Sequence, residues 1–337
     1  MAVIEGSSYA VGFFDFSIAM PEYKYVSQNG HNLYRHLAAV PASGLFHECH
    51  SAPLAHPADL LSEKLAEVVE LYVRTVNELA ESEDSAQLAD LTKAMVLSVN
   101  EFYDQLFLII QCLTPPRPST GQRQADVLSQ LRESNGGVLN KFYGSTKAFH
   151  TYIRDIANVL KHQPSSIAFF QLVNHRGVVV RGFNVQVVIG PDDLRGPSRT
   201  IHPMYRVKVN TGISFNHFLL NILGRVFCYL ERLDAALFNS QSPEVARCLP
   251  DLDRLLDSAK KVQHEFFPDE YRKPFAQLET RRETKVVTFP ARYRLVNKEN
   301  PDRIQSVDFS GFVNQRTWRS HQVIPYLQLT RPDSEWV

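Results

Sequence analysis

The sequence has few of the residues that stabilise secreted proteins or build metal sites. It contains only 4 cysteines in 337 residues, and no two of them form a Cys-x-x-Cys pair. Scattered cysteines are typical of reduced thiols, whereas a disulfide framework or a zinc module needs a characteristic set of spacings. We therefore expect a cytoplasmic protein.

Long apolar runs are also missing. The two most apolar stretches, 106–113 and 218–230, are too short or too interrupted by polar residues to cross a bilayer. The first residues, MAVIEGSSYAVGFFDF, have neither the basic start nor the continuous apolar core of a signal peptide. These absences predict a protein with no membrane partner.

Neither sign of charge is in excess, since 36 lysines and arginines balance 36 aspartates and glutamates. Proteins that bind nucleic acid usually have a basic excess, because neutralising phosphate charge supplies much of their affinity. The balance removes that argument for a nucleic-acid ligand, although it leaves RNA open. Gly-x-Ser-x-Gly, Walker and dinucleotide-binding fingerprints are missing as well, so we expect no cofactor.

Helical periodicity is the strongest positive signal in the sequence. Apolar residues recur every three or four positions, which is the pattern of a helix with one buried face. The spacing predicts helices over residues 58–81, 85–113, 138–162, 215–239 and 251–266. A proline-rich run that begins at Pro115 ends the second helix, and Ser214 is a suitable N-cap for the fourth.

Other segments alternate apolar and polar residues, which is the pattern of a strand. Residues 167–173 and 178–189 predict a β-hairpin joined by a polar turn. Further strands are predicted at residues 9–18, 204–209, 284–296, 303–309 and 321–329. The C-terminal strands either pair with the N-terminal strand or form a separate small sheet, and both arrangements stay open.

These elements predict an α+β fold, with an antiparallel bundle of about four long helices, an inserted β-hairpin and a β-rich C-terminal region. The predicted parts are an extended or irregular N-terminal segment (1–57), the bundle with its hairpin (58–240), and a helix followed by the β-rich region (241–337). Whether residues 270–337 form a separate domain stays open.

The third predicted helix ends in the polar sequence HTYIRDIANVLKHQ, residues 150–163. One flank of its apolar stripe carries four polar residues: His150, Arg154, Asn158 and Lys161. On the other flank, Asp155 and His162 lie two turns apart along the helix and about 20° apart around it. A carboxylate and an imidazole on one face can act as an acid–base pair, while an arginine holds a phosphate.

The fourth predicted helix carries a second polar ladder, formed by His217, Asn221 and Arg225. If the two helices pack together, the two ladders would meet in one polar cleft. The predicted substrate-binding residues there are Lys161, His150, His217, Asn221 and Arg225. The alternative is structural, because cations such as Lys161 and His162 near a helix C-terminus complement the helix dipole and cap its carbonyl groups.

The helix end Arg-Asp-x-x-Asn-x-x-Lys-His, followed by a β-hairpin, resembles the HEPN superfamily (higher eukaryotes and prokaryotes nucleotide-binding domain). The residues that match uncharacterised bacterial members are Asn158, Lys161 and His162, within a resemblance over roughly residues 58–240. The resemblance implies a dimer with a composite site. For catalytic members it implies a metal-independent ribonuclease, often in a bacterial toxin–antitoxin or anti-phage defence system.

The resemblance also implies roles for individual residues. Arg154 would contact the scissile phosphate, and His162 would act as general base or orient the ribose hydroxyl. Asp155 or Asn158 would fix the histidine. Catalytic members separate the arginine and the histidine by about four to six residues, whereas seven residues lie between Arg154 and His162 here. Relatives without the catalytic pair serve as binding or structural modules.

Two functions follow from these observations. The first is a non-catalytic interaction or dimerisation module, favoured by the neutral charge, the arginine–histidine spacing and the β-rich additions. The second is a metal-independent ribonuclease or a nucleotide-binding enzyme, favoured by the family resemblance. The predicted partners are accordingly RNA or a nucleotide, and a second copy of the chain or another protein.

One N-terminal segment gathers imidazole and thiol groups, namely His47, Cys49, His50 and His56. Such groups bind zinc in many proteins, but their spacing here matches no zinc module and a second ligand pair is missing. We therefore predict no metal site, and the role of this cluster stays open.

Overall fold

The structure of the chain is a computed structural model. It describes residues 16–19, 23–26, 30–50, 53–81, 85–116, 127–173, 178–188, 195–202, 212–239, 248–267, 270, 273–281, 284–290, 294–297 and 313–314. Among these residues, no helix combines the length and the apolar character needed to cross a bilayer.

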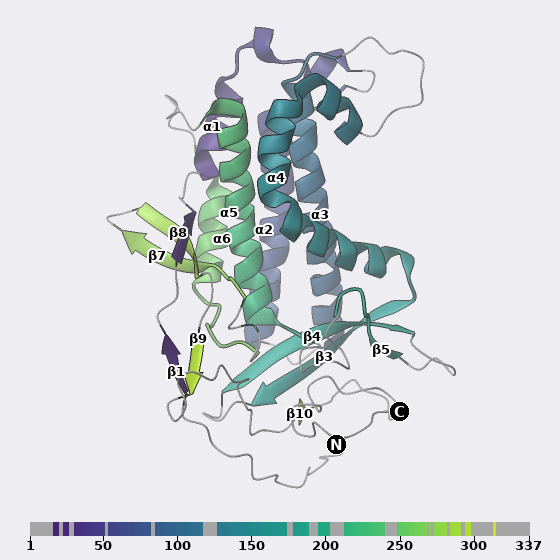
Figure 1. The fold of residues 1–337 in the computed structure, drawn as a ribbon, viewed down its shortest axis with the longest axis vertical. Helices are drawn as coiled ribbons and strands as arrows, with labels where there is room; N and C mark the ends of the chain where they lie inside the picture. Colours follow the sequence, from purple (N-terminus) through teal and green to yellow (C-terminus); the bar gives the residue numbers. More distant parts are fainter. Residues whose placement is uncertain are drawn as a thin grey trace.

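Six α-helices contain most of the described residues. Their bounds are α1 Gly30–Ala39, α2 Pro57–Glu81, α3 Ser85–Cys112, α4 Val127–His162, α5 Phe215–Phe238 and α6 Pro250–Ala259. The four long helices, α2 to α5, run side by side (Figure 1). They confirm the predicted long helices, and together with the strands they confirm the predicted α+β class.

Local signals set several helix ends. The Ser214 side chain accepts a hydrogen bond from the His217 amide nitrogen (3.2 Å) and caps α5, as predicted. α5 ends at Phe238, and its C-cap Asn239 has a φ of 54°, in the left-handed region that asparagine tolerates better than most residues. α4 begins earlier than predicted, at Val127, but its backbone breaks at Asn135 (φ −145°, ψ 45°). The uninterrupted part therefore matches the predicted helix 138–162.

The four long helices pack together with the two short helices α1 and α6, so a bundle of four helices alone is not confirmed. α2 packs on α3, α3 on α4 and α4 on α5, whereas α1 and α6 each contact both α5 and α2. The sequence does not predict α1, because Leu33 and Leu37 are the only apolar side chains that its ten residues bury. The segment predicted as irregular thus contains a helix that packs with the long ones.

α6 is shorter than the spacing predicts, since it ends at Ala259 rather than near residue 266. The chain leaves the helix there and inserts Phe266 and Phe267 into the core, where both side chains are buried. The apolar positions that extend the predicted helix therefore belong to a non-helical segment that packs against α5.

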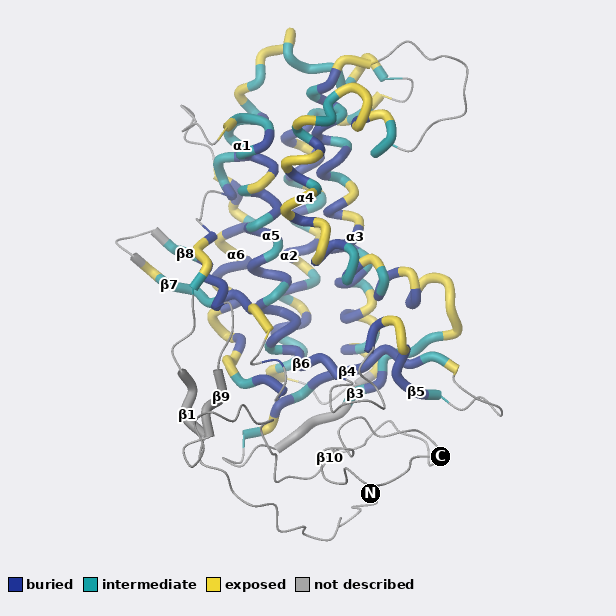
Figure 2. The backbone as a smooth tube through the Cα atoms, in the orientation of Figure 1, coloured by how far each residue is buried: buried dark blue, intermediate teal, exposed yellow. Residues whose placement is uncertain are grey.

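The core lies where the inner sides of the helices meet, and Figure 2 shows buried residues along these sides. Aromatic rings fill part of it: the Tyr103 ring lies 5.5 Å from the Phe142 ring and 4.8 Å from the Tyr229 ring. α5 is the most enclosed long helix, with 15 of its 24 residues buried. Polar side chains on α5 are therefore surrounded by protein far more often than those on α4.

A five-stranded sheet covers one end of the helices (Figure 1). Its strands are β3 Ser165–Val173, β4 Val179–Val188, β5 Arg195–Pro197, β6 Ile213–Ser214 and β10 Val313–Asn314. β3 and β4 form the predicted antiparallel hairpin, with Val173 opposite Val179. Phe183 of β4 anchors the sheet, because its ring lies 5.1 Å from Phe215 and 5.3 Å from Phe218 of α5.

The C-terminal strands pair with N-terminal strands in two further sheets. β8 Thr284–Pro290 lies between β2 Tyr23–Val26 and β7 Gln277–Arg281, and β9 Arg294–Asn297 pairs with β1 Phe16–Ala19. These pairings resolve the two arrangements that the sequence left open. The predicted strands at 204–209, 303–309 and 321–329 lie outside the described residues.

Candidate functional site

The uninterrupted part of α4 presents the predicted catalytic residues along its outer side. Its apolar face, which includes Ile153 and Ile156, is buried against the neighbouring helices. On the opposite side, Arg154, Asn158 and His162 are exposed and Asp155 is half-buried. The amphipathic pattern of this helix therefore placed these groups on the surface, where a ligand or a partner can reach them.

The helix geometry separates the predicted catalytic pair. Arg154 and His162 are eight residues apart, which corresponds to about 12 Å along the axis and about 80° around it. Asp155 and His162 share a side of the helix but are two turns apart, and no hydrogen bond joins them within the described part of the chain. General acid–base catalysis needs groups within about 3 Å of the proton that moves. Within one copy, these residues do not converge on one reacting atom.

Lys161 takes part in a chain of ion pairs across three helices. Its Nζ lies 3.7 Å from Oε1 of Glu101 on α3, and the other oxygen of Glu101 lies 3.4 Å from Nζ of Lys64 on α2. Lys64 also contacts Glu67 at 2.6 Å. The charge of Lys161 is thus balanced by a carboxylate of the protein, and the contact ties α4 to α3.

His150, predicted to bind a substrate, lies inside the helical layer. Its ring stacks on the Tyr103 ring at 3.8 Å, and its Nδ1 is buried without a hydrogen-bond partner. Burial, helped by the nearby Arg154 guanidinium, lowers the pKa of His150 to about 4. The imidazole is therefore neutral near pH 7 and supplies no positive charge for a phosphate group.

His217 is buried at the other end of the layer, in the first turn of α5. Burial lowers its pKa to about 3, and its Nδ1 lies 3.9 Å from Oε1 of the buried Glu270. Glu270 accepts hydrogen bonds from the backbone nitrogens of Ser214 (2.8 Å) and Phe267 (2.9 Å). His217 thus belongs to the contact that holds the segment after α6 against the start of α5.

Arg225 and Asn221 complete the predicted ladder of α5. The Arg225 guanidinium lies 5.2 Å from the centre of the Phe149 ring on α4 and 5.3 Å from that of Phe289 on β8. Its Nε donates a hydrogen bond to Oδ1 of Asn221 (3.4 Å). These contacts are cation–π packing that joins α4, α5 and β8.

The two predicted ladders therefore do not form one cleft. The structure brings α4 and α5 together, but Arg225 meets the apolar Phe149 rather than the polar flank of α4. His217 lies near the five-stranded sheet, and Arg154 lies on the outer surface. The contact between α4 and α5 was predictable from the sequence. Which elements cover the polar flank of each helix was not.

The N-terminal histidines contact helix ends. His56 Nδ1 accepts a hydrogen bond from the Ala58 nitrogen in the first turn of α2 (3.2 Å), and His50 Nε2 donates one to the Gln111 carbonyl near the end of α3 (3.0 Å). His47 packs edge-on against His56, and Cys49 is exposed. In the described ranges, no group of three or more histidine, cysteine, aspartate or glutamate residues can hold a metal ion.

Sequence reasoning missed several buried polar groups that organise the fold. His202 Nε2 accepts a hydrogen bond from the Val185 nitrogen (3.0 Å), and burial lowers its pKa to about 3. His36 Nδ1 and Asp234 Oδ1 lie 2.6 Å apart between α1 and α5, and burial raises the pKa of Asp234. None of these residues belongs to a polar pattern in its own stretch of sequence, so their spacing does not predict them.

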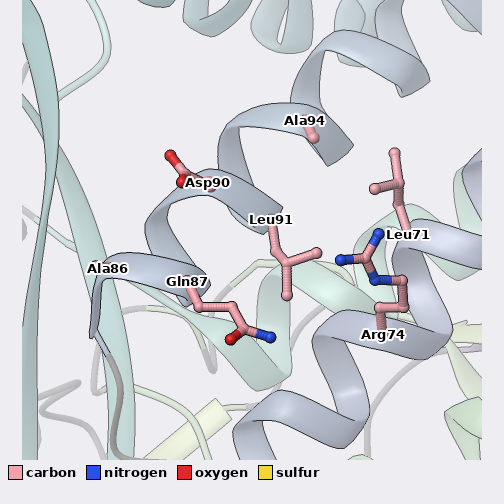
Figure 3. Close-up of a pocket in the computed structure, with 7 residues that line it drawn as sticks. All are labelled: Leu71, Arg74, Ala86, Gln87, Asp90, Leu91 and Ala94. Carbon is pink, nitrogen blue, oxygen red and sulfur yellow. The ribbon is translucent and has the colours of Figure 1, made fainter.

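A shallow depression between α2 and α3 also escapes the sequence. Its apolar part is formed by Leu71, Leu91, Ala86 and Ala94, and the charged side chains at its margin are Arg74 and Asp90 (Figure 3). Leu71 and Ala94 are half-buried positions on the outer sides of their helices. An apolar residue in the polar half of each helical pattern is the signal that could have found this surface.

Comparisons of the chain with protein-family models, with curated proteins and with solved structures give no match.

Proposed function

We propose that the chain is a non-catalytic interaction module of HEPN-like type, which acts by binding a second copy or another protein. The family resemblance implies a bacterial defence or toxin–antitoxin setting for such a module. The observation that carries the proposal is that the predicted site residues do not come together in one cleft. The α5 residues and His150 of α4 are packing groups, and the other α4 residues are spread along an open helix surface.

The chemistry of the individual residues supports a binding role. Lys161 is paired with Glu101, and His150 and His217 are buried and neutral near pH 7. Arg154 and His162 are exposed, but about 12 Å of helix separates them. A phosphoryl-transfer site needs positive charge and a base aimed at the same few atoms. A surface for a partner has no such requirement.

The test is a cleavage assay on transfer RNA and mixed cellular RNA with EDTA present. We expect no cleavage above a buffer control, and the same result for Arg154→Ala and His162→Ala. Cleavage by the natural chain that disappears in both variants, with an unchanged circular dichroism spectrum and oligomeric state, would overturn the proposal.

The alternative function is a metal-independent ribonuclease or a nucleotide-binding enzyme that uses Arg154 and His162. The observation that favours it is a row of exposed cations at seven-residue spacing on α4, formed by Lys147, Arg154 and Lys161. In a site shared by the α4 helices of two copies, Arg154 of one copy would act beside His162 of the other. The separation of these two residues within one copy would then not prevent catalysis. The cleavage assay above decides between the two functions.

A further inference from the structure

The face of the five-stranded sheet that points away from α5 carries two buried carboxamides without hydrogen-bond partners. Asn184 and Gln186 lie two residues apart on β4 and face away from the side of Phe183, whose ring packs on α5. Asn184 is fully buried and Gln186 almost so. Nδ2 and Oδ1 of Asn184 and Nε2 of Gln186 have no partner. In the described part of the chain, no other carboxamide leaves both of its polar atoms buried and unpaired.

A cation lies on the same face of the sheet, where β3, β4 and β5 run side by side (Figure 1). Arg195 of β5 is opposite Val188 of β4, and its Nη1 donates a hydrogen bond to Oγ of Ser166 (3.2 Å). Ser166 is opposite Gln186 in the hairpin, so this contact places the half-buried guanidinium beside Gln186. Arg195 pairs with no carboxylate of the described residues. A half-buried charge whose only partner is neutral favours an anion beside it.

The groups on this face are mostly hydrogen-bond donors. The amide nitrogens of Asn184 and Gln186 have free N–H groups, and so does the guanidinium of Arg195. The Ser166 hydroxyl accepts from Arg195 and can still donate its own hydrogen. Successive residues on one face of a strand are about 7 Å apart, so one small molecule can reach both carboxamides. Ala168, opposite Asn184, has a small side chain that leaves room above the strand pair.

The described charges place an anionic group at one end of this face. The carboxylate of Glu270 accepts a hydrogen bond from the backbone nitrogen of Ser214, which is opposite Gly182 of β4. The ring of Phe267 fills the space at Gly182. A negative charge and a bulky ring thus occupy the Gly182 end, whereas Arg195 lies at the opposite end. An anion is favoured at the end with Arg195.

We propose that this face of β4 binds a small oxyanion, namely a phosphate or carboxylate compound with a hydrogen-bond donor beside its anionic group. Arg195, Ser166 and Gln186 hold the anionic oxygens. Asn184 donates one hydrogen bond from Nδ2 and accepts one at Oδ1 from the donor of the ligand. The site lies on the sheet, away from the exposed residues of α4, so it goes beyond the proposed function and does not depend on it.

Other occupants fit this face less well. Ordered water can satisfy a carboxamide, but it brings no charge to the guanidinium. An apolar molecule would leave the three amide atoms unpaired, and a cation would be repelled by Arg195. A nucleic acid is too large to reach the fully buried Asn184. A small ion can enter through the local openings that folded proteins undergo.

The test is isothermal titration calorimetry of the full chain with inorganic phosphate and, separately, with glycolate, against sodium chloride of equal ionic strength. We expect saturable binding of at least one of the two anions, with a dissociation constant of about 1 mM or below. Phosphate binding alone indicates a phosphate compound as the ligand, and glycolate binding alone indicates a hydroxy acid or a related carboxylate. Sodium chloride should give no saturable heat.

Substitutions on the face should weaken the binding of whichever anion binds. Asn184→Leu keeps the side-chain volume while removing the unpaired atoms, so the variant should fold. Asn184→Leu and Arg195→Gln should each raise the dissociation constant by about tenfold or more. The matched controls are Gln87→Leu on α3 and Arg132→Gln on α4, both at exposed positions, and they should bind as the natural chain does.

A folded natural chain that binds neither anion would overturn the inference and leave water as the partner of the carboxamides. Binding that Asn184→Leu and Arg195→Gln leave unchanged would overturn it as well, because the anion would then lie elsewhere. If circular dichroism shows that Asn184→Leu is unfolded, Gln186→Met replaces it with the same expected loss. The RNA cleavage assay concerns α4 alone, so its result and the result of this titration are independent.

Discussion

α4 and α5 carry polar ladders of similar spacing, yet the α4 ladder, apart from the buried His150, is open to solvent and the α5 ladder is largely covered. Arg154 and Asn158 of α4 are exposed, whereas His217 of α5 is buried and Arg225 lies between two aromatic rings. The difference comes from what packs on each flank. α5 contacts α1, α4, α6 and strands of two sheets, so elements distant in sequence cover its polar side.

Spacing alone therefore identifies side chains that share a flank of a helix, but not the chemistry that they perform. A polar flank that faces solvent offers groups to a ligand or a partner. A polar flank that is covered must satisfy its hydrogen bonds internally, because an unpaired buried polar group is costly. The covered flank of α5 should therefore be far less tolerant of substitution than the open flank of α4.

The largest expected effect is at Glu270, beside the covered ladder. Its carboxylate accepts hydrogen bonds from the backbone nitrogens of Ser214 and Phe267. Glu270→Ala leaves both donors unpaired and should lower the free energy of unfolding by about 3–5 kcal/mol. Urea denaturation followed by circular dichroism measures the change. Glu63→Ala, at an exposed position of α2, is the matched control and should change it by less than about 0.5 kcal/mol. Equal effects of the two substitutions would contradict the role given to Glu270.

The next largest effect comes from replacing one glycine on each helix by alanine, which should change the free energy of unfolding in opposite directions. A Cβ at Gly224 of α5 would overlap the Phe289 ring, whereas a Cβ at Gly144 of α4 would meet nothing within 4 Å. Gly224→Ala should therefore lower the free energy of unfolding by about 1–3 kcal/mol. Gly144→Ala should raise it by up to about 1 kcal/mol, because alanine favours the helix.

Both glycine variants are measured in the same urea titration. Because Phe289 belongs to β8, a Gly224→Ala chain should also show faster amide exchange in the three-stranded sheet than in α4. Stabilisation by Gly224→Ala would show that Phe289 does not pack against α5 in solution, and the covered environment of Arg225 would then be in question.

Local patterns were enough to predict the long helices and the hairpin. The apolar spacing of α3, the capping by Ser214 and the alternation in β4 are each encoded within a few neighbouring residues. α1 and the pairing of β8 with β2 were not predictable to the same degree. They depend on contacts across most of the chain, such as the register of Tyr23 with Pro290.

The candidate site was predictable only in part, for the same physical reason. Helix periodicity correctly put Arg154 and Asn158 on one flank, which the structure leaves exposed. It could not show that Phe289, more than sixty residues further along the chain, covers Arg225. Nor could it find His202, because its hydrogen bond to Val185 arises only when the sheet has formed.

The smallest expected effect concerns the pH dependence of stability, and it distinguishes two histidines of α4. The pKa of the buried His150 is lowered to about 4, mainly by burial, so below an unfolded pKa of about 6.5 the unfolded chain binds the proton more tightly. The contribution of the neutral His150 to the free energy of unfolding is therefore fully present above about pH 6.5. It is lost as the pH falls from about 6.5 toward 4. His150→Phe keeps a ring against Tyr103 and should reduce the loss of unfolding free energy between about pH 7 and pH 5 by about 1–2 kcal/mol.

Urea titrations at these two pH values measure the effect of His150→Phe, and His162→Phe is its matched control. His162 is exposed at the end of the same helix, so its replacement should leave the loss between the two pH values unchanged. His202 and His217, whose pKa values are lowered to about 3, keep part of the pH dependence in both variants. If His162→Phe flattens the dependence and His150→Phe does not, then His162 is the shielded imidazole. The open flank of α4 would in that case be covered in solution, which would remove the contrast with α5.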